Sequence, residues 1–516
     1  MSDLGFWTIA ANDPGRLSLV EPEGNEVTFG ELRANANRIS HGLRRLGLEA
    51  GDGVAMVMWN RREFVETVLA TSQIGLYFTA VNFHLTGPEI AYIVGDCEAK
   101  VFIGDVRFAE SCTAAMDELS FPEERRFATD GISGFRDFID LTDGMPDDPP
   151  ADRTAGQTML YTSGTTGRPK GVRRPLSGAD PDAAAAAGGL LAGLFDIAPG
   201  EGVHLVAGPL YHAAPLAFGS GALNLGQTLV LMDKWTPEST LELIDRYKVT
   251  SSHMVPTMFH RLLALADDVK ARYDVSSVRN IIHAAAQCPV DVKQRMIEWW
   301  GEVVYEYYAA TEVGGTYVKP KDWLEHPGTV GQPWPGSEVK VLDDDGNEVP
   351  PGEPGTIYMK SAAQGSFEYY KDSEKTKANR RGDLVTVGDI GYMTEDNWLY
   401  LHDRKSDMII VGGVNIYPAE VEGILLTHPK VGDAAVIGVP HPEYGEEVKA
   451  VIEPADGVEP SDELASELVA FCQSKLAKFK CPRSVDFRDE LPRYPTGKLY
   501  KRLIRDEYWA GAEKKI

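Results

Sequence analysis

Residues 161–172 read YTSGTTGRPKGV and place three glycines, four hydroxyl residues, a proline and a lysine in twelve positions. The preceding residues MLY are typical of a strand, and Pro169 and Gly171 prevent a helix from beginning at Lys170. The pattern therefore predicts a strand, a loop and a second strand. Backbone N–H groups and hydroxyls of this loop can surround phosphate oxygens, and Lys170 adds a positive charge. The hydroxyls are those of Thr162, Ser163, Thr165 and Thr166.

This loop is not a Walker P-loop, in which a Ser or Thr follows the lysine and the segment opens a helix. Here Gly171 follows Lys170. A solvated hairpin turn is the purely structural alternative. Turns rarely combine this many glycines, hydroxyls and a lysine, so we favour a phosphate-binding loop.

The first part of the chain alternates helical and strand patterns from residue 28 onward. Apolar residues recur at helical spacing after Thr28, a plausible cap, at Leu32, Ala36, Ile39, Leu43 and Leu46. Further helices are predicted over 62–75 and around 87–96, and strands over 53–60, 77–83 and 100–104. Such alternation predicts a parallel sheet covered by helices.

Later segments differ in pattern. Residues 120–157 are rich in Asp, Pro and Gly and are expected to form a surface connection. A helix is expected to start within 182–189, and a second alternating series runs from about 203 to 310. Short strands and turns over 328–402 predict a small β subdomain, and an α+β pattern follows residue 413. We expect an α/β protein with a large N-terminal domain of helix-covered β-sheets, this β subdomain, and a smaller α+β C-terminal domain.

Composition excludes several classes of function. The chain has 516 residues, and 51 Lys and Arg against 77 Asp and Glu give a formal charge of −26. This charge disfavours nucleic acid and anionic membrane as partners. Motifs for zinc proteases, serine hydrolases and dinucleotide binding are absent, and the histidines do not cluster as zinc ligands.

The five cysteines are scattered without a C-x-x-C pair, so we expect no disulfide framework. The first residues show no secretory signal pattern, and no run of about 18 apolar residues predicts a membrane span. The expectation is a cytoplasmic protein, and a homodimer is compatible with these features.

The stretch TSGTTGRPKG resembles the phosphate loop of the adenylate-forming superfamily, which contains acyl-CoA synthetases, peptide-synthetase adenylation domains and firefly luciferase. Four further segments resemble that family in its order. They are YYAATE (307–312), VGDIGY (387–392), DRKSDMIIVGGVNIYPAEVE (403–422) and PTGKLYKR (495–502).

The resemblance implies an ATP site. Tyr308 would lie near the adenine, Thr311 would contact the α-phosphate, and Glu312, with Thr162, would hold Mg²⁺. Asp389 would accept hydrogen bonds from both ribose hydroxyls, and Arg404 would contact ribose and phosphate. The remaining nucleotide-binding residues implied are Ser163, Gly164, Thr165, Thr166, Gly167, Lys170, Ala285, Glu306 and Tyr307.

The chain departs from the family pattern at several of these segments. Val387 replaces the usual Thr, and Ala309 stands where the family has Gly. In HAAAQCP (283–289), Ala284 and Gln287 replace the Gly and Pro of a turn under the adenine. Ala309 should narrow the space beside it, and Ala284 and Gln287 should change the shape of the pocket, whereas the change at Val387 has no explanation.

The resemblance also divides the chain into an ATP- and acyl-binding domain over 1–404 and a mobile C-terminal domain over 405–516. Ser406 would be the hinge. Lys498 would be the mobile catalytic lysine, because an ammonium group stabilises the charge that spreads over a five-coordinate phosphorus. A strip of Gly412, Gly413 and Val414 would line a coenzyme A channel.

His212, in PLYHAAPLAFGSG (209–221), would orient or gate the acyl group and count with Lys498, Glu312 and Thr311 as catalytic. The acyl pocket would further include Ala213, Phe218, Ala284 and Ala309. Its apolar character favours a medium- or long-chain fatty acid, or a bulky steroid-like acid.

The sequence therefore predicts an AMP-forming acyl-CoA synthetase that uses Mg²⁺, ATP and coenzyme A. One alternative is a stand-alone enzyme that loads a carrier-protein phosphopantetheine, although no carrier segment follows Ile516. No feature of the sequence requires a luciferase activity. A non-catalytic nucleotide-binding relative is disfavoured by the presence of both Lys498 and Glu312.

Overall fold

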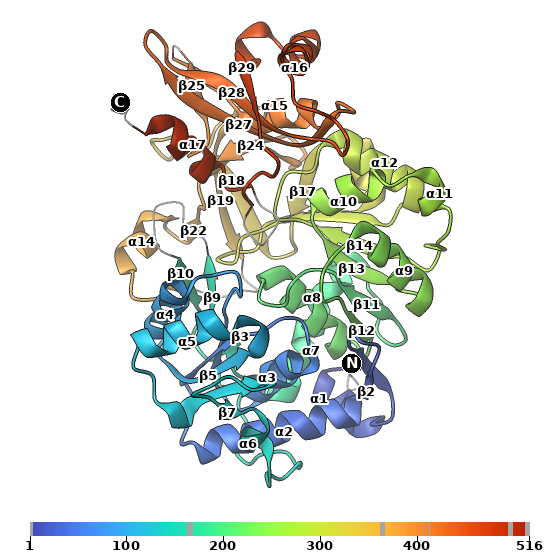
Figure 1. The fold of residues 1–516 in the computed structure, drawn as a ribbon, viewed down its shortest axis with the longest axis vertical. Helices are drawn as coiled ribbons and strands as arrows, with labels where there is room; N and C mark the ends of the chain where they lie inside the picture. Colours follow the sequence, from blue (N-terminus) through green and yellow to red (C-terminus); the bar gives the residue numbers. More distant parts are fainter. Residues whose placement is uncertain are drawn as a thin grey trace. The chain divides into compact units, whose positions relative to one another are not determined.

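The computed structural model describes residues 4–162, 169–361, 367–404, 406–411, 413–493 and 499–510. The chain forms two compact units (Figure 1). The first takes in residues 1–254, 265–282 and 364–378, and the second takes in 255–264, 283–363 and 379–516.

Six parallel strands form one sheet of the first unit, in the order β7-β6-β5-β3-β4-β8. Along β3, Val54 and Met56 point to one face, and Ala55 and Val57 to the other. The first face is covered by α2 and α3 and the second by α4 and α5, so both faces are buried (Figure 1). The bounds are β3 Gly53–Val57, β4 Tyr77–Ala80, β5 Ala99–Asp105, β6 Arg126–Thr129, β7 Arg136–Asp137, β8 Gln157–Thr158, α2 Phe29–Arg45, α3 Arg62–Gln73, α4 Gly87–Asp96 and α5 Ala109–Glu118.

Local capping explains why the helices begin where the sequence predicted. Thr28 accepts a hydrogen bond from the backbone of Glu31 at 3.2 Å, and Glu31 accepts one from the backbone of Thr28 at 2.8 Å. Thr86 and Glu89 form the same reciprocal box at the start of α4. Each box satisfies two backbone N–H groups that the helix leaves unpaired. The predicted cap at Thr28 is confirmed.

Glu66, on the buried side of α3, is 3% exposed and accepts a hydrogen bond from the Asn35 amide of α2 at 2.7 Å. Burial raises the pKa of Glu66 from 4.5 to about 7. Between these two pH values the folded protein therefore holds a proton on Glu66 that the unfolded chain releases. The contribution of the protonated Glu66 to the free energy of unfolding is fully present below about pH 4.5 and is lost as the pH rises through about 7.

We expect Glu66→Gln to remove this pH dependence. Relative to the wild type, its free energy of unfolding should rise by about 2–3 kcal/mol between pH 4.5 and pH 8. Urea unfolding at a series of pH values measures the difference, with Glu110→Gln on exposed α5 surface as the control. If the free energies of unfolding of the wild type and of Glu66→Gln changed in parallel with pH, the raised pKa of Glu66 would be contradicted.

A second set of strands in the first unit runs in the order β2-β1-β12-β11-β13-β14. The strands predicted near 203, 228, 251 and 280 are confirmed as β11, β12, β13 and β14. The pairing of β1 with β12 was not predicted, because it joins distant segments in parallel. The bounds are β1 Leu17–Val20, β2 Glu26–Thr28, β11 Val203–Val206, β12 Thr228–Leu231, β13 Ser251–Met254, β14 Asn280–His283, α1 Phe6–Asn12, α7 Pro181–Leu190, α8 Ala213–Asn224 and α9 Pro237–Tyr247.

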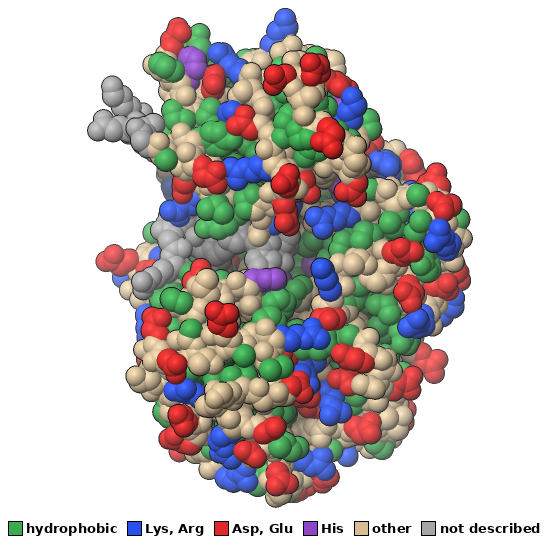
Figure 2. Space-filling view, viewed as in Figure 1, with side chains coloured by type: hydrophobic (Ala, Val, Ile, Leu, Met, Phe, Trp, Pro, Cys, Tyr) green, Lys and Arg blue, Asp and Glu red, His purple; other side chains and the backbone are tan. Residues whose placement is uncertain are grey.

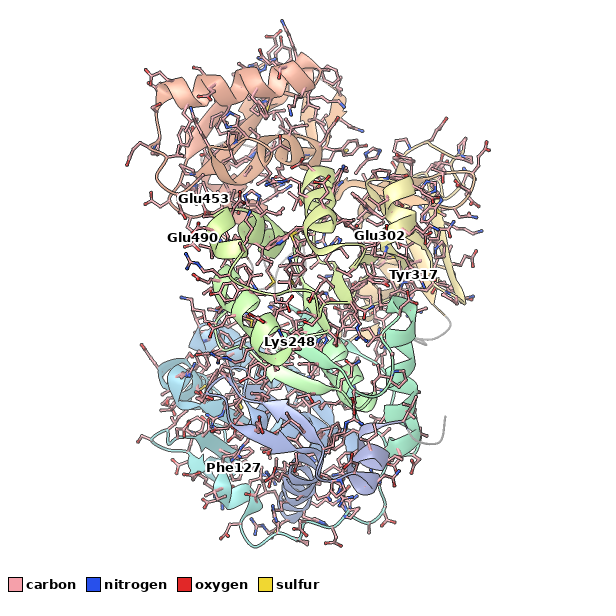
Figure 3. All side chains as sticks on the ribbon, turned by 90° about the vertical axis from the view of Figure 1, so that its right-hand side faces the viewer. Phe127, Lys248, Glu302, Tyr317, Glu453 and Glu490 are labelled. Carbon is pink, nitrogen blue, oxygen red and sulfur yellow. The ribbon has the colours of Figure 1, made fainter. Side chains whose placement is uncertain are left out.

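The expectation that residues 120–157 form only a surface connection is wrong. They contribute β6, whose Phe127 is fully buried and lies within the first unit (Figure 3). Arg126 on the same strand is 8% exposed, and its Nε donates to the carbonyl of Phe121 at 2.7 Å. A charged residue in a four-residue strand hides the apolar pattern, although its hydrogen bonds make its burial possible.

The second unit contains a series of mainly antiparallel strands in the order β15-β16-β17-β24-β23-β19-β22-β21, with β18 paired to β19. This confirms the predicted β region over 328–402. The bounds are β15 Val304–Tyr308, β16 Thr316–Val318, β17 Thr329–Pro333, β18 Ser337–Leu342, β19 Gly355–Ser361, β21 Arg380–Arg381, β22 Leu384–Val385, β23 Asp389–Met393, β24 Leu399–Arg404, α12 Val290–Trp300 and α13 Pro320–Glu325.

A five-stranded sheet in the order β26-β25-β28-β27, with β29 on β28, forms the C-terminal part of the second unit. Its helices and strands confirm the predicted α+β pattern, and the α/β fold class is confirmed for the chain. The boundary at residues 404 and 405 stays a prediction. The bounds are β25 Ile409–Val411, β26 Val414–Ile416, β27 Val431–His441, β28 Gly445–Pro454, β29 Ser484–Phe487, α15 Pro418–Leu425, α16 Asp462–Lys475 and α17 Lys501–Trp509.

Three further features of the described chain concern its charged surface, its cysteines and the length of its helices. On the face shown in Figure 2, acidic and basic side chains are interspersed. All five cysteines are buried free thiols. None of the helices in the described part of the chain combines the length and apolar composition that crossing a bilayer requires.

Candidate active site

The predicted phosphate loop is flanked by two antiparallel strands, β9 (Leu160–Thr162) and β10 (Lys170–Arg173). Lys170 pairs with Thr162 in this antiparallel pair, so the two predicted strands are confirmed. A Cβ at Gly171 would lie 2.4 Å from the terminal methyl group of Met159, so a larger residue here would require the Met159 side chain to shift. Ser163, Gly164, Thr165, Thr166 and Gly167 lie outside the described residues.

Lys170 has a carboxylate partner that sequence reasoning missed. Its Nζ lies 3.0 Å from Oδ2 of Asp372, just after β20 (Glu368–Tyr369), which pairs with β10. The hydrogen bond that Lys170 donates to the Asp372 carboxylate raises the pKa of Lys170, so the lysine stays charged. Asp372 gave no motif signal in the sequence, because an Asp before a short helix is a common cap.

Tyr308, Asp389 and Arg404 come together in the second unit from β15, β23 and β24. The Tyr308 hydroxyl donates to Oδ2 of Asp389 at 2.7 Å, and Nε of Arg404 lies 3.2 Å from Oδ1. Burial, followed by the Asp389 carboxylate, holds the pKa of Tyr308 well above its usual range. The Asp389 carboxylate is therefore oriented by the neutral Tyr308 hydroxyl and by the Arg404 guanidinium. It lies beside the Tyr308 ring and can still accept hydrogen bonds from the two hydroxyls of a diol.

The loop after β15 carries Thr311 and Glu312. A tight turn between Ala310 and Val313 closes it through two backbone hydrogen bonds of 3.0 and 3.2 Å. Gly315 lets β16 approach β15, since a Cβ there would lie 2.1 Å from the Tyr308 carbonyl oxygen. Glu312 is 7% exposed, and Ala309, where the sequence departs from the family glycine, is half-buried.

The segment HAAAQCP follows β14 and holds two of the predicted residues. Ala284 is buried, whereas Ala285 is exposed and has a φ of 75°. A non-glycine residue in this left-handed region costs about 1 kcal/mol or more and persists only where its surroundings enforce it. Nε2 of Gln287 donates to the Leu401 carbonyl at 3.3 Å and ties the segment to β24.

Glu306 and Tyr307 lie on β15 with different surroundings. Glu306 is 5% exposed, and its carboxylate lies 2.7 Å from Nζ of Lys293. The Tyr307 ring lies 6.4 Å from the Trp334 ring, centroid to centroid. A nucleotide contact by Glu306 stays a prediction, and the structure shows its side chain engaged with Lys293.

His212, Ala213 and Phe218, predicted for the acyl group, lie in the first unit at and along α8. His212 is the residue before the first turn, and its ring centroid lies 4.2 Å from that of Tyr211. Phe218 is 8% exposed and stacks on His253 at 5.2 Å. The local surroundings are thus aromatic and imidazole side chains rather than aliphatic ones alone.

The predicted hinge residue Ser406 lies before β25, and Gly413 and Val414 of the predicted coenzyme A strip lie at the turn and start of β26. Ser406 accepts a hydrogen bond at its backbone carbonyl from Nη1 of Arg505 at 3.1 Å. Gly413 has a φ of 86° between strands β25 and β26, and Val414 is 46% exposed. Gly412 and Lys498 lie outside the described residues.

A model of the AMP-binding enzyme family matches residues 6–370, and a model of the AMP-binding enzyme C-terminal domain matches residues 420–498. The chain belongs to the AMP-binding enzyme family. The predicted resemblance to adenylate-forming enzymes is thereby confirmed, and so is the assignment as an AMP-forming acid–thiol ligase.

Relatives and solved structures agree with this membership. The chain is 32% identical to the fatty acid–[acyl-carrier-protein] ligase ScoC of Streptomyces coeruleorubidus, over 96% of this chain and 94% of the relative. It is 33% identical to a feruloyl-CoA synthase of an Amycolatopsis species, over 98% of this chain and 99% of the relative. It is similar to the crystal structure of ATP-bound MatB from Rhodopseudomonas palustris, with 29% identity, a TM-score of 0.82, and 98% and 99% of the two chains covered.

AMP-binding enzymes that form acyl-CoA generally use Mg²⁺ with ATP. The site's chemistry fits this ion, because Mg²⁺ takes one or two carboxylates and obtains its other ligands from phosphates and water. Glu312 offers one carboxylate, and the backbone of Thr162 closes the strand before the phosphate loop. Glu312 and Thr162 would hold the ion, which stays a prediction for both residues.

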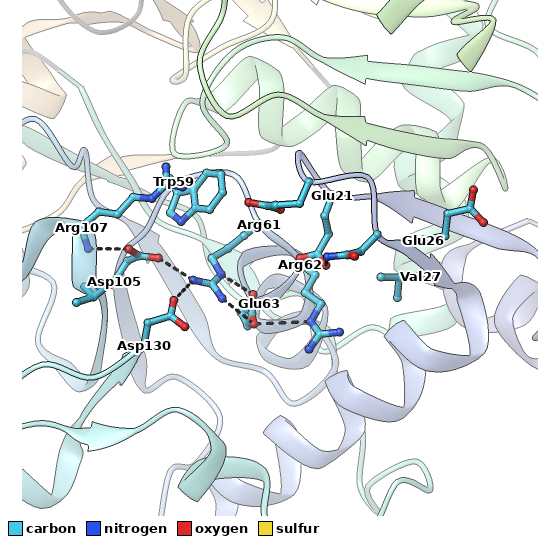
Figure 4. A pocket seen from close by; sticks show the side chains of 13 residues that line it. Glu21, Glu26, Val27, Trp59, Arg61, Arg62, Glu63, Asp105, Arg107 and Asp130 are labelled. Carbon is cyan, nitrogen blue, oxygen red and sulfur yellow. Dashed lines mark hydrogen bonds and ion pairs between the residues drawn. The ribbon is translucent and has the colours of Figure 1, made fainter. Parts of the chain in front are cut away.

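A separate cavity of about 410 Å³ lies at the carboxyl ends of β3, β5 and β6 (Figure 4). Its guanidinium groups are engaged by carboxylates. Arg61 contacts Glu63, Asp105 and Asp130, and Arg107 contacts Asp233 at 2.7 Å while stacking on the Trp59 ring at 3.4 Å. Paired arginines offer little attraction to phosphate, and none of the predicted site residues lines this cavity.

Proposed function

We propose that the protein is an ATP-dependent acyl-CoA synthetase that activates a hydrophobic carboxylic acid through an acyl-AMP intermediate. The observation that carries the proposal is the arrangement of Tyr308, Asp389 and Arg404, which suits an adenosine. The ring of Tyr308 can stack on adenine, and Asp389 can accept two ribose hydroxyl hydrogen bonds.

In the first half-reaction, the substrate carboxylate attacks the α-phosphorus of ATP and pyrophosphate leaves. Lys170 and the backbone of the 162–170 loop would bind phosphate oxygens, and Thr311 would bind the α-phosphate. Lys498 would stabilise the negative charge that develops on the five-coordinate phosphorus. Mg²⁺, when bound, would neutralise charge on the departing pyrophosphate.

In the second half-reaction, the thiolate of coenzyme A attacks the acyl carbonyl and AMP leaves. AMP is a far better leaving group than hydroxide, so adenylation supplies the driving force. Gly412, Gly413 and Val414 would line the path of the pantetheine arm. A rotation about Ser406 would bring this strip to the acyl-AMP and withdraw Lys498.

A hydrophobic acid is supported by the buried Phe218 and Ala284. The class of acid is proposed as a medium- or long-chain fatty acid or a steroid-like acid. The similarity to ScoC, a ligase that acts on fatty acid and acyl carrier protein, favours one second candidate, namely loading of a carrier-protein phosphopantetheine. The similarity to a feruloyl-CoA synthase supports coenzyme A as the acceptor.

Purified protein should be incubated with Mg-ATP and a panel of short to long fatty acids, aryl acids and steroid acids, with and without coenzyme A. We expect AMP and a thioester with one hydrophobic class. Acyl-AMP that accumulates without thioester would shift the proposal to a carrier protein. Formation of neither product across the panel, with ATP bound, would contradict the proposed activity.

Replacing Asp389 by Asn tests the adenosine site. The substitution keeps the size of the side chain. It removes the negative charge that would accept hydrogen bonds from the ribose hydroxyls and that contacts Arg404. We expect the KM for ATP to rise about tenfold, with an unchanged KM for the acid, since a hydrogen bond to a charged group contributes about 1.5–3 kcal/mol. Asp396→Asn on the exposed turn before β24 is the control. An unchanged KM for ATP in the Asp389 variant would remove this residue from the site.

A further inference from the structure

A buried lysine lies against the strand that carries the proposed adenosine contacts. Lys293, on α12, is fully buried, and its Nζ lies 2.7 Å from Oε2 of Glu306 on β15. The ammonium group also lies 4.6 Å from the ring centre of Trp323, which is 1% exposed. An exposed lysine on a helix is common, whereas a fully buried one needs a specific partner.

Glu306 connects this lysine to a second segment of the site. Its Oε2 lies 3.4 Å from Nε2 of His283, the last residue of β14. His283 is fully buried and packs edge-on against Phe259 at 5.2 Å. It directly precedes Ala284 and Ala285, and Glu306 lies two residues before Tyr308, on the same face of β15.

The charges on these groups follow from their surroundings. Burial alone would raise the pKa of Glu306, but Lys293 and His283 outweigh it and hold the pKa at about 2. Burial lowers the pKa of His283, so this ring is neutral near pH 7. The carboxylate is thus ionised, and the ammonium of Lys293 compensates it.

An ion pair of this kind is a poor way to gain stability. Removing two charges from water is unfavourable, and well-packed apolar residues of similar size often give an equal or greater free energy of unfolding. Directionality is what the pair adds, because a hydrogen-bonded contact of 2.7 Å fixes two segments more tightly than apolar packing does. The two segments fixed here are β15, which ends at Tyr308, and α12, which begins directly after the segment 284–289.

We propose that Lys293 and Glu306 are positioning residues for the nucleotide, and that their ion pair holds α12, and with it the preceding segment 284–289, against β15. The pair acts through Tyr308 and the segment after His283, and it does not itself need to contact ATP. This inference rests on the proposed function, because it assumes that adenosine binds at Tyr308 and Asp389.

The test is the double variant Lys293→Met/Glu306→Leu, which removes the pair without leaving a buried charge unpaired. We expect its melting temperature to stay near that of the wild type, while the KM and Kd for Mg-ATP rise about tenfold, because positioning errors weaken binding without removing a contact. The KM for the acid should not change. Lys293→Arg, which keeps the charge, should retain most of the ATP affinity.

The control is Arg295→Met on the same helix, where the exposed pair with Asp291 spans 3.7 Å. Calorimetric titration with Mg-ATP in the absence of acid separates this inference from the proposed function. A wild type that forms no thioester, with a double variant that binds ATP tenfold more weakly, would refute the function and support the positioning role. A stable double variant with wild-type ATP affinity would overturn the positioning role whatever the wild type catalyses. If the double variant does not fold, wild-type ATP affinity in a folded Glu306→Gln variant would overturn it equally.

Discussion

Lys498→Ala should lower the rate of acyl-AMP formation by a factor of about 10²–10³ while leaving the Kd for ATP nearly unchanged. The reason is that the ammonium acts on charge that develops only at the five-coordinate phosphorus, so its loss affects the transition state more than the bound substrate. Pyrophosphate release, measured with saturating ATP and acid, reports this step directly.

Described residues that flank Lys498 in the sequence make contacts that the substitution leaves in place, so we expect the variant to fold. On one side, Nε of Arg493 donates to Asp433 at 2.7 Å, and on the other, Nζ of Lys501 lies 2.9 Å from Glu422. The substitution removes none of these four partners. A second readout is thioester formation from acyl-AMP supplied directly, which should persist in Lys498→Ala if the lysine serves only the first half-reaction.

Lys475→Ala, on the exposed side of α16, is the matched control and should behave as the wild type. A wild-type rate of acyl-AMP formation in Lys498→Ala would show that the charge on phosphorus is stabilised by other groups. The family resemblance at PTGKLYKR would then no longer imply a catalytic role for this residue.

Local signals explain which elements the sequence predicted. The helix after Thr28 was predicted because a plausible cap precedes apolar residues at helical spacing, which is a short-range pattern, and the structure shows a reciprocal cap at its start. The strand β6 was missed because Arg126 and Thr129 leave only two apolar residues in this four-residue strand, and the hydrogen bonds from Arg126 to backbone carbonyls that allow its burial are tertiary. The parallel pairing of β1 with β12 depends on chain segments far apart, which no local pattern encodes.

The residues of the candidate site likewise fall into those that the sequence predicted and those that only the fold shows. The motifs identified Tyr308, Asp389 and Arg404 one at a time, but only the fold shows that one carboxylate joins the other two side chains. Lys293 was missed because a lysine on an amphipathic helix reads as a solvated charge, and its partner Glu306 lies on another element. Family motifs thus predict the groups that touch a substrate better than the groups that hold them in place.

Arg61→Leu should reduce the free energy of unfolding by about 3–5 kcal/mol, because it leaves a buried carboxylate without its cation. Arg61 joins the carboxyl ends of β3, β5 and β6 (Figure 4). Its Nη1 lies 3.1 Å from Asp105 and 2.7 Å from Asp130, and its Nε lies 2.7 Å from Glu63. The side chain of Asp105 is fully buried, so water cannot replace the guanidinium.

Arg62→Leu is the matched control on the next residue. Its side chain is 45% exposed and its contact with Glu63 spans 3.7 Å, so its loss should cost less than about 1 kcal/mol. The double variant Arg61→Leu/Asp105→Asn should recover part of the loss, because it neutralises the stranded charge. Urea unfolding followed by tryptophan fluorescence measures all three, and equal losses in Arg61→Leu and Arg62→Leu would show that the buried Asp105 does not depend on Arg61.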